Sequence, residues 1–515
     1  MLLPRSARSW SRRKPTSAAL QLLAFFFFLL FLHTRVARLP VQDEAVRKPG
    51  ADRPKSPLLQ HQAAFWKDLY QIILNNDPHC EHLPEIVVPH KLDIGFDPSH
   101  NHPRPDVLWM EPADIKHMQE AHSNFVHDIK RSPPRLVYEP NTRGIVMTAG
   151  YLQLPVLVTS LRMLRRTGSL LPVEVFLADG PDYDDDVCDQ ILPSLNAKCL
   201  LLSDVFQAAK SGLSIDHYQY KIMAVLFSSF EQVLLLDSDA FPLHDPLSIF
   251  GEEPFNTTGM VVWPDFWYAS ESPYYFEIAK LDTVPALHTR ASMESGEILY
   301  SKSQHALSIM LATYYNFYGP MYYYPLLSQG APGEGDKETF AWAATVFGEP
   351  FHAVRDPVKA LGRLDSSGTF LGSAMVQHDP SVNFAREPNT RGASDHSDLF
   401  SSHVIAPRPL FIHANFPKFD PSTIFTEGND RTGIGGPTRD SNGTSIRCWM
   451  DKEKAIERFG FDVEYRFWEE IRGTACEYER HFGCWKGKEG ICKRVTKYWY
   501  DVFEPIVTRQ QEHSL

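Results

Sequence analysis

The sequence predicts an α/β fold built on a mostly parallel sheet with helices on both of its faces. From residue 143 to residue 240, short apolar runs alternate with stretches of helical periodicity, at the spacing of βαβ units. The last apolar run, VLLL at 233–236, leads directly into Asp237, Ser238 and Asp239. Ligands of such sheets bind where the carboxyl ends of the strands open into a crevice, so these carboxylates mark a candidate functional edge.

The elements are expected in a fixed order along this region. Apolar runs predict strands at 143–150, 172–180, 197–205 and 231–240. Helical periodicity predicts helices at 154–168, 184–195 and 220–230, the second of them limited by Pro193. Two helices are expected before the first strand, at 61–76 and near 112–131, and an aromatic helix is expected at 340–347.

The N-terminus predicts a membrane anchor. Five basic residues precede an apolar run at 17–32 that contains four consecutive phenylalanines. The run is about 15 residues long, which is short for a full bilayer but suits a thin Golgi-type membrane. A cleaved signal peptide is the alternative, but no small-x-small cleavage site follows. We therefore expect an uncleaved signal anchor with a cytoplasmic N-terminus and a lumenal remainder.

The predicted organisation has six parts. They are a cytoplasmic basic tail (1–16), a signal-anchor helix (17–34), a stem (35–60), an N-terminal lumenal extension (61–140), a catalytic domain (141–425) and a Cys-rich C-terminal extension (426–515). The formal net charge of -12, with no basic domain, argues against a nucleic-acid-binding protein.

The cysteines indicate an oxidising compartment. Four of the seven lie at 448–492, without the close C-x-x-C pairs of a zinc ribbon, so disulfides are the favoured interpretation. A zinc site involving His481 stays open as the alternative. The odd count leaves at least one thiol free or intermolecular. Asn256 and Asn442 begin glycosylation acceptor triplets, which agree with a lumenal location.

Asp237 and Asp239 form a candidate metal site. Residues i and i+2 of a strand point to one side, so the two carboxylates converge if the strand continues through Ser238. Two such carboxylates repel each other and are costly to bury, and a divalent cation such as Mg or Mn resolves both problems. The chain has neither a Walker phosphate loop nor a G-x-G-x-x-G after its first strand. The other Asp-x-Asp triplets, at 182–186, are expected to form a solvated turn.

Several stretches together resemble the fungal Golgi α-mannosyltransferases of glycosyltransferase family 71, the Mnn1/Mnn2-type enzymes. The resemblance covers about 143–421 and rests on these stretches, in order: YQYKIMAVLFSSFEQVLLLDSDAFPLHDP (218–246), ESGEILYSKSQH (294–305), GDKETF (335–340), MVQHDP (375–380) and FIHANFPKFDP (411–421). It implies a GT-A-type, Rossmann-like fold and a Mn-dependent site at the Asp-x-Asp. It also implies a GDP-mannose donor, a mannan or N-glycan acceptor, and a single-pass type II protein of the Golgi membrane.

The resemblance also suggests roles for the two aspartates and for a histidine. Asp239 is expected to ligate the metal directly, and Asp237 to reach the metal through water or to reach the ribose of the donor. His413 resembles the late histidine that completes the metal shell. The alternative for His413 is a structural histidine in a proline-rich loop after a strand.

Four further charged residues are candidates for the donor and acceptor. Lys418 is expected to face the diphosphate. Asp336 is the first choice for the group that orients the transferred mannose or its acceptor hydroxyl, and Lys337 is a second catalytic candidate. For Lys337, a solvated salt bridge at a helix start is an equal alternative. Lys221 is expected to contact nucleotide or phosphate, or simply to begin an amphipathic helix.

Two aromatic stretches are candidate sugar platforms. YYNFYGPMYYYP at 314–325 fits sugar stacking and core packing equally well, whereas WPDFWY at 263–268 is better placed to contact the acceptor.

Two functions from different classes follow. The favoured one is a membrane-anchored, retaining α-mannosyltransferase that could assemble with itself or with other mannosyltransferases. The alternative is a non-catalytic carbohydrate-binding or scaffold subunit of a mannosyltransferase complex. Ala240 stands where the family often has asparagine, which favours the alternative, but both aspartates are kept.

Overall fold

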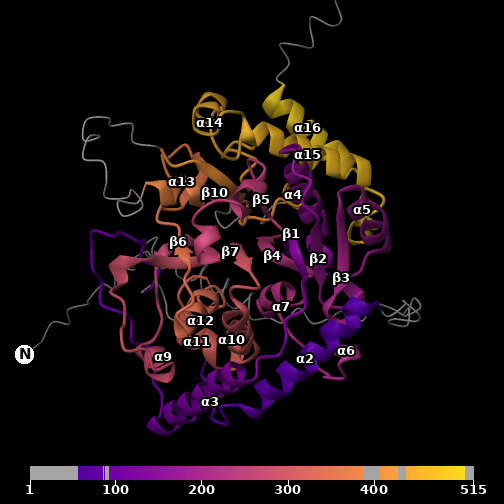
Figure 1. The fold of residues 1–515 in the computed structure, drawn as a ribbon. Coiled ribbons are helices and arrows are strands. Elements are labelled where there is room, and N and C mark those ends of the chain that lie inside the picture. The colour runs from indigo at the N-terminus through magenta and orange to yellow at the C-terminus, as the bar shows by residue number, and fades with distance from the viewer. Residues whose placement is uncertain are drawn as a thin grey trace, which may run out of the picture. The chain divides into compact units, whose positions relative to one another are not determined.

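A seven-stranded sheet with the order β3-β2-β1-β4-β7-β6-β8 dominates this computed structural model (Figure 1). The structure describes residues 56–84, 86, 92–333, 335–386, 406–426 and 436–504. The strands are β1 (Glu139–Thr148), β2 (Val173–Leu177), β3 (Ala197–Leu201), β4 (Phe230–Asp237), β6 (Met260–Tyr268), β7 (Ala291–Ser301) and β8 (His352–Ala353). Pairs β1–β2, β2–β3, β1–β4 and β6–β8 are parallel, and only β7 runs against both of its neighbours. The prediction of a mostly parallel sheet is confirmed.

A second, antiparallel sheet has the order β5-β11-β10-β9. Its strands are β5 (Ala240–Pro242), β9 (Lys359–Leu364), β10 (Phe370–His378) and β11 (Pro409–His413). Since β5 begins only three residues after β4 ends, the two sheets meet beside the acidic triplet at 237–239.

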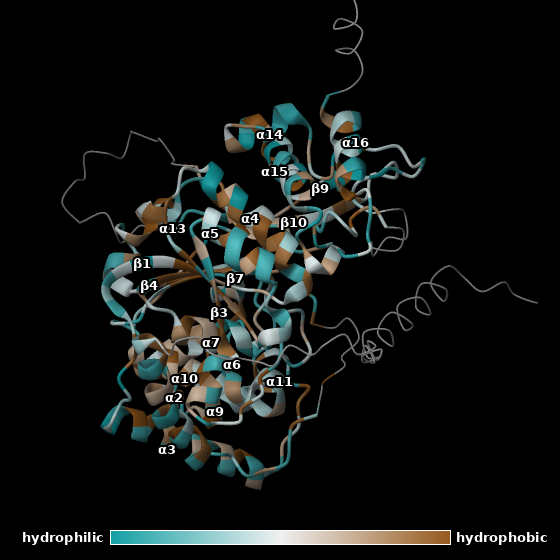
Figure 2. Ribbon diagram, turned by 90° about the vertical axis from the view of Figure 1, so that its right-hand side faces the viewer, coloured by the Kyte–Doolittle hydropathy of each residue, from teal (hydrophilic) through white to brown (hydrophobic). Residues whose placement is uncertain are grey.

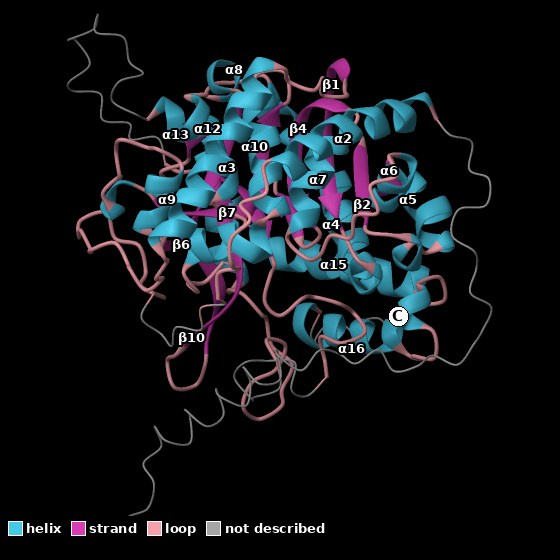
Figure 3. Ribbon diagram, turned by 90° about the horizontal axis from the view of Figure 1, so that it is seen from below, coloured by secondary structure: helices cyan, strands magenta, loops and turns pink. Residues whose placement is uncertain are grey.

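Helices cover both faces of the large sheet, as predicted (Figures 1 and 2). Their bounds are α2 (Pro57–Asn75), α3 (Pro112–Arg131), α4 (Leu154–Arg166), α5 (Leu192–Ser194), α6 (Leu202–Ala208), α7 (Gln219–Phe227), α8 (Phe255–Thr258), α9 (Pro273–Ile278), α10 (Ala306–Phe317), α11 (Tyr324–Ser328), α12 (Thr339–Phe347), α13 (Pro380–Ala385), α14 (Lys452–Phe459), α15 (Val463–Tyr478) and α16 (Ile491–Phe503). Figure 3 shows α3, α7 and α10 in front of the strands.

Strand β4 is buried on both faces, which explains its unbroken apolar run. Leu234 and Leu236 pack in a core shared with α4, the antiparallel sheet and α14 to α16. Val233 and Leu235 pack in a second core with α2, α3, α7, α10 and α12. The strand therefore carries its terminal carboxylate on a rigid, fully packed element.

Three local expectations differ from the structure. The predicted strand at 197–205 ends at Leu201, and α6 begins at Leu202, because Leu202, Val205 and Phe206 have helical spacing and are all buried. The segment before Pro193 forms a π-helical turn, Val187–Ile191, ahead of the short α5. The chain does not continue as a strand through Ser238 but turns there, and the Ser160 hydroxyl donates to the Ser238 carbonyl at 2.8 Å.

Two disulfides confirm the favoured interpretation of the cysteines. Cys188 pairs with Cys199, and Cys476 pairs with Cys492 across α15 and α16. The thiols of Cys80, Cys448 and Cys484 are free.

The predicted anchor at 17–34 lies outside the described residues. Within those described residues, none of the helices combines the length and the apolar character that crossing a membrane requires.

Candidate active site

The candidate site lies where β4 ends and the two sheets meet. Asp237 is the last residue of β4, and Asp239 lies in the turn before β5. His413 is the last residue of β11 and pairs with Ala240 of β5. The Ala414 amide donates to the Asp239 carbonyl at 2.9 Å, which continues this pairing past the strand end. A strand 174 residues further along the chain thus delivers an imidazole to the two carboxylates.

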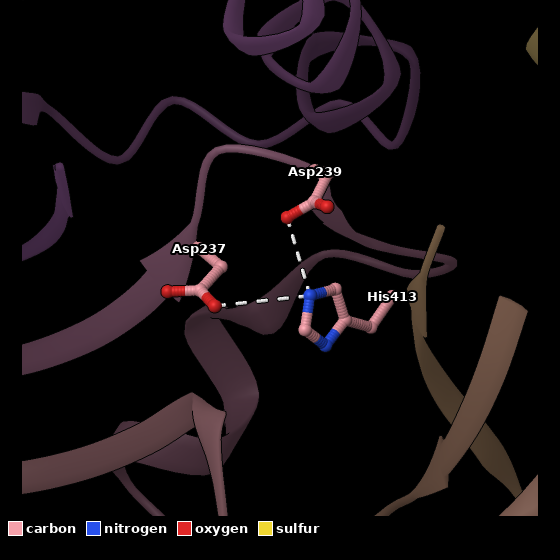
Figure 4. Close-up of side chains that lie close together, drawn as sticks. All are labelled: Asp237, Asp239 and His413. Carbon is pink, nitrogen blue, oxygen red and sulfur yellow. Dashed lines mark hydrogen bonds and ion pairs between the residues drawn. The ribbon is translucent and has the colours of Figure 1, made fainter. Parts of the chain in front are cut away.

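Asp237, Asp239 and His413 point toward one another (Figure 4). The Nε2 atom of His413 lies 3.2 Å from Oδ1 of Asp239 and 3.7 Å from Oδ2 of Asp237. One ligand atom from each of the three residues lies within 4.8 Å of the other two. Two carboxylates and one imidazole are a donor set that suits Mn²⁺, so the residues present fit a divalent cation. The turn at Ser238 replaces the expected extended strand and still brings the carboxylates together.

Positive groups surround the buried carboxylate of Asp239. Burial would raise the pKa of Asp239, but the Lys418 ammonium, which contacts Oδ2, and His413 hold it below its usual value. Burial would lower the pKa of His413, but Asp239, with smaller contributions from Glu297 and Glu294, raises it to about 10. The carboxylate of Asp239 therefore contacts two basic side chains.

Lys221 links Asp237, one of the candidate metal ligands, to Asp336. Its ammonium donates to Oδ2 of Asp237 at 2.9 Å and to Oγ of Ser295 at 3.0 Å. The Ser295 hydroxyl in turn donates to Oδ2 of Asp336 at 3.1 Å. Burial raises the pKa of Asp336, although Lys221 opposes the shift. The structure thus brings Lys221 and Asp336 into the same cluster as Asp237, through a serine to which the sequence analysis gave no role.

Lys337 lies beside Asp336 in the chain, but its ammonium is bound elsewhere. It donates to Oδ2 of Asp265 at 2.6 Å and to the Pro332 carbonyl at 3.0 Å. Lys337 and Asp265 are both buried. The alternative expected for Lys337, a salt bridge exposed to solvent, is therefore wrong, because the salt bridge lies in the protein interior. The catalytic role of Lys337 stays a prediction.

A buried ionic network supports the turn that carries Asp336. Arg290 donates to Oε2 of Glu338 at 3.0 Å, and the other Glu338 oxygen accepts from the Met293 amide at 2.8 Å. Arg290 also approaches Glu271, whose second oxygen accepts from Arg104 at 2.5 Å. The N-terminal extension therefore reaches this turn indirectly, because Arg104 binds the Glu271 carboxylate that Arg290 also approaches.

Strand β7 contributes two glutamates behind the site that sequence reasoning assigned no role. Glu297 is fully buried, and neither of its carboxylate oxygens has a hydrogen-bond partner among the described residues. Burial raises the pKa of Glu297 to about 8. Glu294 lies 3.7 Å from Nδ1 of His413. The quoted stretch ESGEILYSKSQH contains both, but no local pattern indicates that they lie behind a histidine more than a hundred residues away.

The aromatic candidates differ in exposure. The six tyrosines of the 314–325 stretch are all buried, which supports its interpretation as core packing. In the 263–268 stretch, Trp263 is buried and donates its indole N–H to the His378 carbonyl at 2.8 Å. Phe266 and Trp267 keep partly exposed rings, so this stretch stays the candidate acceptor platform.

The other Asp-x-Asp triplets, at 182–186, were expected to form a solvated turn, and this expectation is wrong for one of their residues. Asp184 is buried, and its Oδ2 accepts from the Gly483 amide at 2.7 Å. It ties the turn after β2 to the α15–α16 connection. Its neighbour Asp185 is exposed.

Comparisons with known proteins find mannosyltransferases among the relatives of this chain. The family model described as "Mannosyltransferase putative" matches residues 142–289 and 282–379. The Alpha-1,2-mannosyltransferase MNN21 of Candida albicans is 32% identical over 449 residues, which are 76% of this chain and 66% of that protein. The Alpha-1,2-mannosyltransferase MNN2 of Saccharomyces cerevisiae is 32% identical over 423 residues, 70% of this chain and 69% of that protein. The matches thus leave about a third of each relative's length uncovered.

Among solved structures, the glycosyltransferase GlyE of Streptococcus pneumoniae TIGR4 is similar over 42% of this chain and 45% of its own. The sequence identity is 14% and the TM-score 0.29, a likeness too slight to carry an argument.

Proposed function

Because the chain belongs to the family of fungal α-1,2-mannosyltransferases, we propose that it transfers mannose from GDP-mannose to a mannan or N-glycan acceptor. The reaction retains the α configuration of the transferred mannose, and the new linkage is α-1,2, as in the names of the relatives. The fold is of the GT-A type. The protein works as a single-pass type II protein of the Golgi membrane, with its catalytic region in the lumen.

The observation that carries the proposal is the convergence of Asp237, Asp239 and His413 at the carboxyl end of β4. These three residues would hold Mn²⁺ or Mg²⁺. When bound, the cation supplies positive charge that stabilises the departing GDP.

Lys221 and Lys418 would bind the donor diphosphate. Each ammonium already contacts one carboxylate of the Asp-x-Asp, so both lie within reach of an anion held at that place. Charge-assisted hydrogen bonds from ammonium groups to phosphate are strong and position the leaving group. Because the Lys221 side chain is only 13% exposed and is held by Ser295, it is the more constrained of the two.

Asp336 would orient the transferred mannose or the acceptor hydroxyl. Its Oδ2 accepts from Ser295, which leaves Oδ1 for a sugar hydroxyl. The partly exposed rings of Phe266 and Trp267 would contact the acceptor sugar. Retention is consistent with a front-face route in which the leaving phosphate takes the proton of the acceptor hydroxyl. Trapping of a covalent mannosyl-enzyme would instead establish a double displacement.

The direct test is transfer by the purified full-length protein in detergent. GDP-mannose, Mn²⁺ and an α-mannoside acceptor are supplied, and the product linkage is determined by NMR. We expect an α-1,2-linked product that requires the cation. Absence of both transfer and GDP release over a panel of mannose acceptors would favour the alternative, a non-catalytic carbohydrate-binding subunit.

The membrane placement has its own test. Carbonate extraction should leave the protein in the membrane fraction, and its N-terminal sequence should begin before residue 17. A soluble product that begins after about residue 38 would contradict the signal anchor.

A further inference from the structure

The two nitrogens of His413 have different surroundings. Nε2 faces Asp237 and Asp239, as described above. Nδ1 faces β7 and is buried without a hydrogen-bond partner among the described residues. The nearest acid on that side is Glu294, whose Oε1 atom lies 3.7 Å from Nδ1. An unpartnered ring nitrogen in a buried site therefore points toward one carboxylate.

The backbone of β7 leaves room for this approach at Gly296. A Cβ atom at this position would lie 2.6 Å from Nδ1 of His413 and 3.1 Å from Oε1 of Glu294. The Gly296 amide donates to the same Oε1 atom at 2.9 Å, which holds the carboxylate on the His413 side of the strand. Glycine thus lets the ring and the carboxylate share a space that any other residue would fill.

We propose that Glu294 is a positioning residue, which accepts the Nδ1–H of His413 and thereby keeps Nε2 free for the divalent cation. The inference rests on the proposed function, because it assumes that His413 binds that cation. A neutral imidazole that donates from Nδ1 presents its lone pair at Nε2. A carboxylate behind the ring also raises the basicity of the coordinating nitrogen and fixes the ring orientation.

The present distance is an ion-pair distance, and a hydrogen bond needs an approach of about half an ångström. The Glu294 side chain retains a small exposed fraction, 14%, so it has freedom to make this adjustment. Burial, followed by Asp265, raises the pKa of Glu294, whereas His413, Lys221 and Lys337 oppose that rise.

Glu297 provides a matched control. It lies three residues further along the same strand and also acts electrostatically on His413, but no hydrogen bond or ion pair joins the two residues. Glu294→Gln and Glu297→Gln each remove one carboxylate and keep the side-chain shape. Only the first removes the carboxylate that faces Nδ1.

The experiment is a Mn²⁺ titration of the purified full-length protein without donor, in which free Mn²⁺ is measured by electron paramagnetic resonance. Loss of a carboxylate behind a ligating histidine typically weakens metal binding 10- to 100-fold. We expect Glu294→Gln to raise the Kd for Mn²⁺ by about tenfold and Glu294→Ala by more. Glu297→Gln should stay within about threefold of the wild type.

A double-mutant cycle separates positioning from a general structural effect. In a His413→Gln background, Glu294→Gln should cause no further loss of Mn²⁺ affinity, because the residue acts through the histidine. Gly296→Ala, which forces the ring and the carboxylate apart, should weaken Mn²⁺ binding in the same way as Glu294→Gln. Thermal unfolding of each variant identifies any protein that fails to fold. The variants that do fold then decide whether Glu294 acts through His413.

The outcomes are distinguishable. A wild-type protein that binds no Mn²⁺ would overturn the proposed metal-dependent function, and the role of Glu294 with it. A wild-type protein that binds Mn²⁺ while Glu294→Gln binds it equally well would overturn this inference alone. An equal loss from Glu297→Gln, or an undiminished effect of Glu294→Gln in the His413→Gln background, would also contradict it.

Discussion

The ammonium of Lys418 contacts the carboxylate of Asp239, although 52% of the Lys418 side chain is exposed and only 1% of the Asp239 side chain is. A long side chain that is largely in solvent therefore places its charged end on a buried acid. A divalent cation at this position would compete with the ammonium for the same oxygens. The same lysine would then be free to approach a phosphate.

Lys418→Met should shift two affinities in opposite directions. Removal of the competing ammonium is expected to strengthen Mn²⁺ binding, whereas loss of a phosphate contact should weaken GDP-mannose binding by about tenfold. Isothermal titration calorimetry measures both. Lys454→Met is the matched control, because Lys454 is an exposed lysine paired with Asp451 at 3.1 Å, away from the site. Identical affinities in Lys418→Met and wild type would remove Lys418 from the donor site.

Asp239→Asn should reduce Mn²⁺-dependent transfer by at least about 100-fold while the protein still folds. The substitution removes the buried negative charge that Mn²⁺ requires and keeps the shape of the side chain. Asp237→Asn should have the same effect less completely, since Asp237 lies further from His413 Nε2. Initial rates of mannose transfer measure the effect. Asp185→Asn is the control, because Asp185 is an exposed aspartate of another Asp-x-Asp triplet. Near wild-type turnover of Asp239→Asn would refute the metal site.

Mn²⁺ binding should strengthen as the pH rises from 6 to 8. The pKa of His413 is raised to about 10, so the ring is protonated throughout this range and must release its proton when it ligates the cation. One released proton gives up to about a tenfold gain in apparent affinity per pH unit. Mn²⁺ titrations at several pH values measure how steeply the apparent affinity changes with pH. His413→Gln should bind Mn²⁺ more weakly with a flatter slope, and an equal slope in both proteins would assign the proton to another group.

Arg104→Ala should lower the free energy of unfolding by about 3–5 kcal/mol, because it leaves the buried carboxylate of Glu271 without its closest cation. Chemical denaturation measures the change. Arg131→Ala, at an exposed arginine 3.9 Å from Asp128, is the control and should change stability by less than about 0.5 kcal/mol. Addition of Glu271→Gln to Arg104→Ala should restore part of the stability, and a further loss would argue against the ionic explanation.

Removal of the Cys476–Cys492 disulfide by a double serine substitution should cost about 3 kcal/mol of unfolding free energy, as expected for a closed loop of this length. Urea unfolding under oxidising conditions checks the value. Cys484→Ser removes a free thiol from the same connection and serves as the comparison. Equal stability of the double variant and the wild type would show that the disulfide contributes nothing.

The sequence predicted the first half of the large sheet because its signals are local. Each strand between residues 143 and 240 is a short apolar run, and each helix between them has its own periodicity. The end of the third strand was the exception, since α6 follows it at once and also contains apolar residues, so no local signal marks the boundary. The acidic end of β4 was predicted for the same reason, because the strand and both carboxylates lie within a few residues.

The remaining parts of the site depend on contacts between distant segments. Nothing near Ser295 in the sequence indicates that it joins Lys221 to Asp336, and nothing near Glu294 indicates that a histidine lies behind it. Both are consequences of the placement of β7 between β4 and β6, which no local periodicity encodes. Asp184 shows the reverse error, because this residue of a locally polar run was expected in solvent and is buried, with its carboxylate bound to the amide of Gly483.

The pairing of β5 with β11 also sets the order in which the candidate site can be completed. During synthesis from the N-terminus, the strands from β1 to β7 emerge well before residues 409–413, so a nascent chain contains the aspartates long before it contains His413. Closing a loop of this length is entropically costly and is repaid only when the antiparallel sheet forms. A folding intermediate that has the large sheet but lacks β11 would hold the two carboxylates without their third partner. Under the proposed function, cation binding would report on the completion of folding as well as on the chemistry of the site.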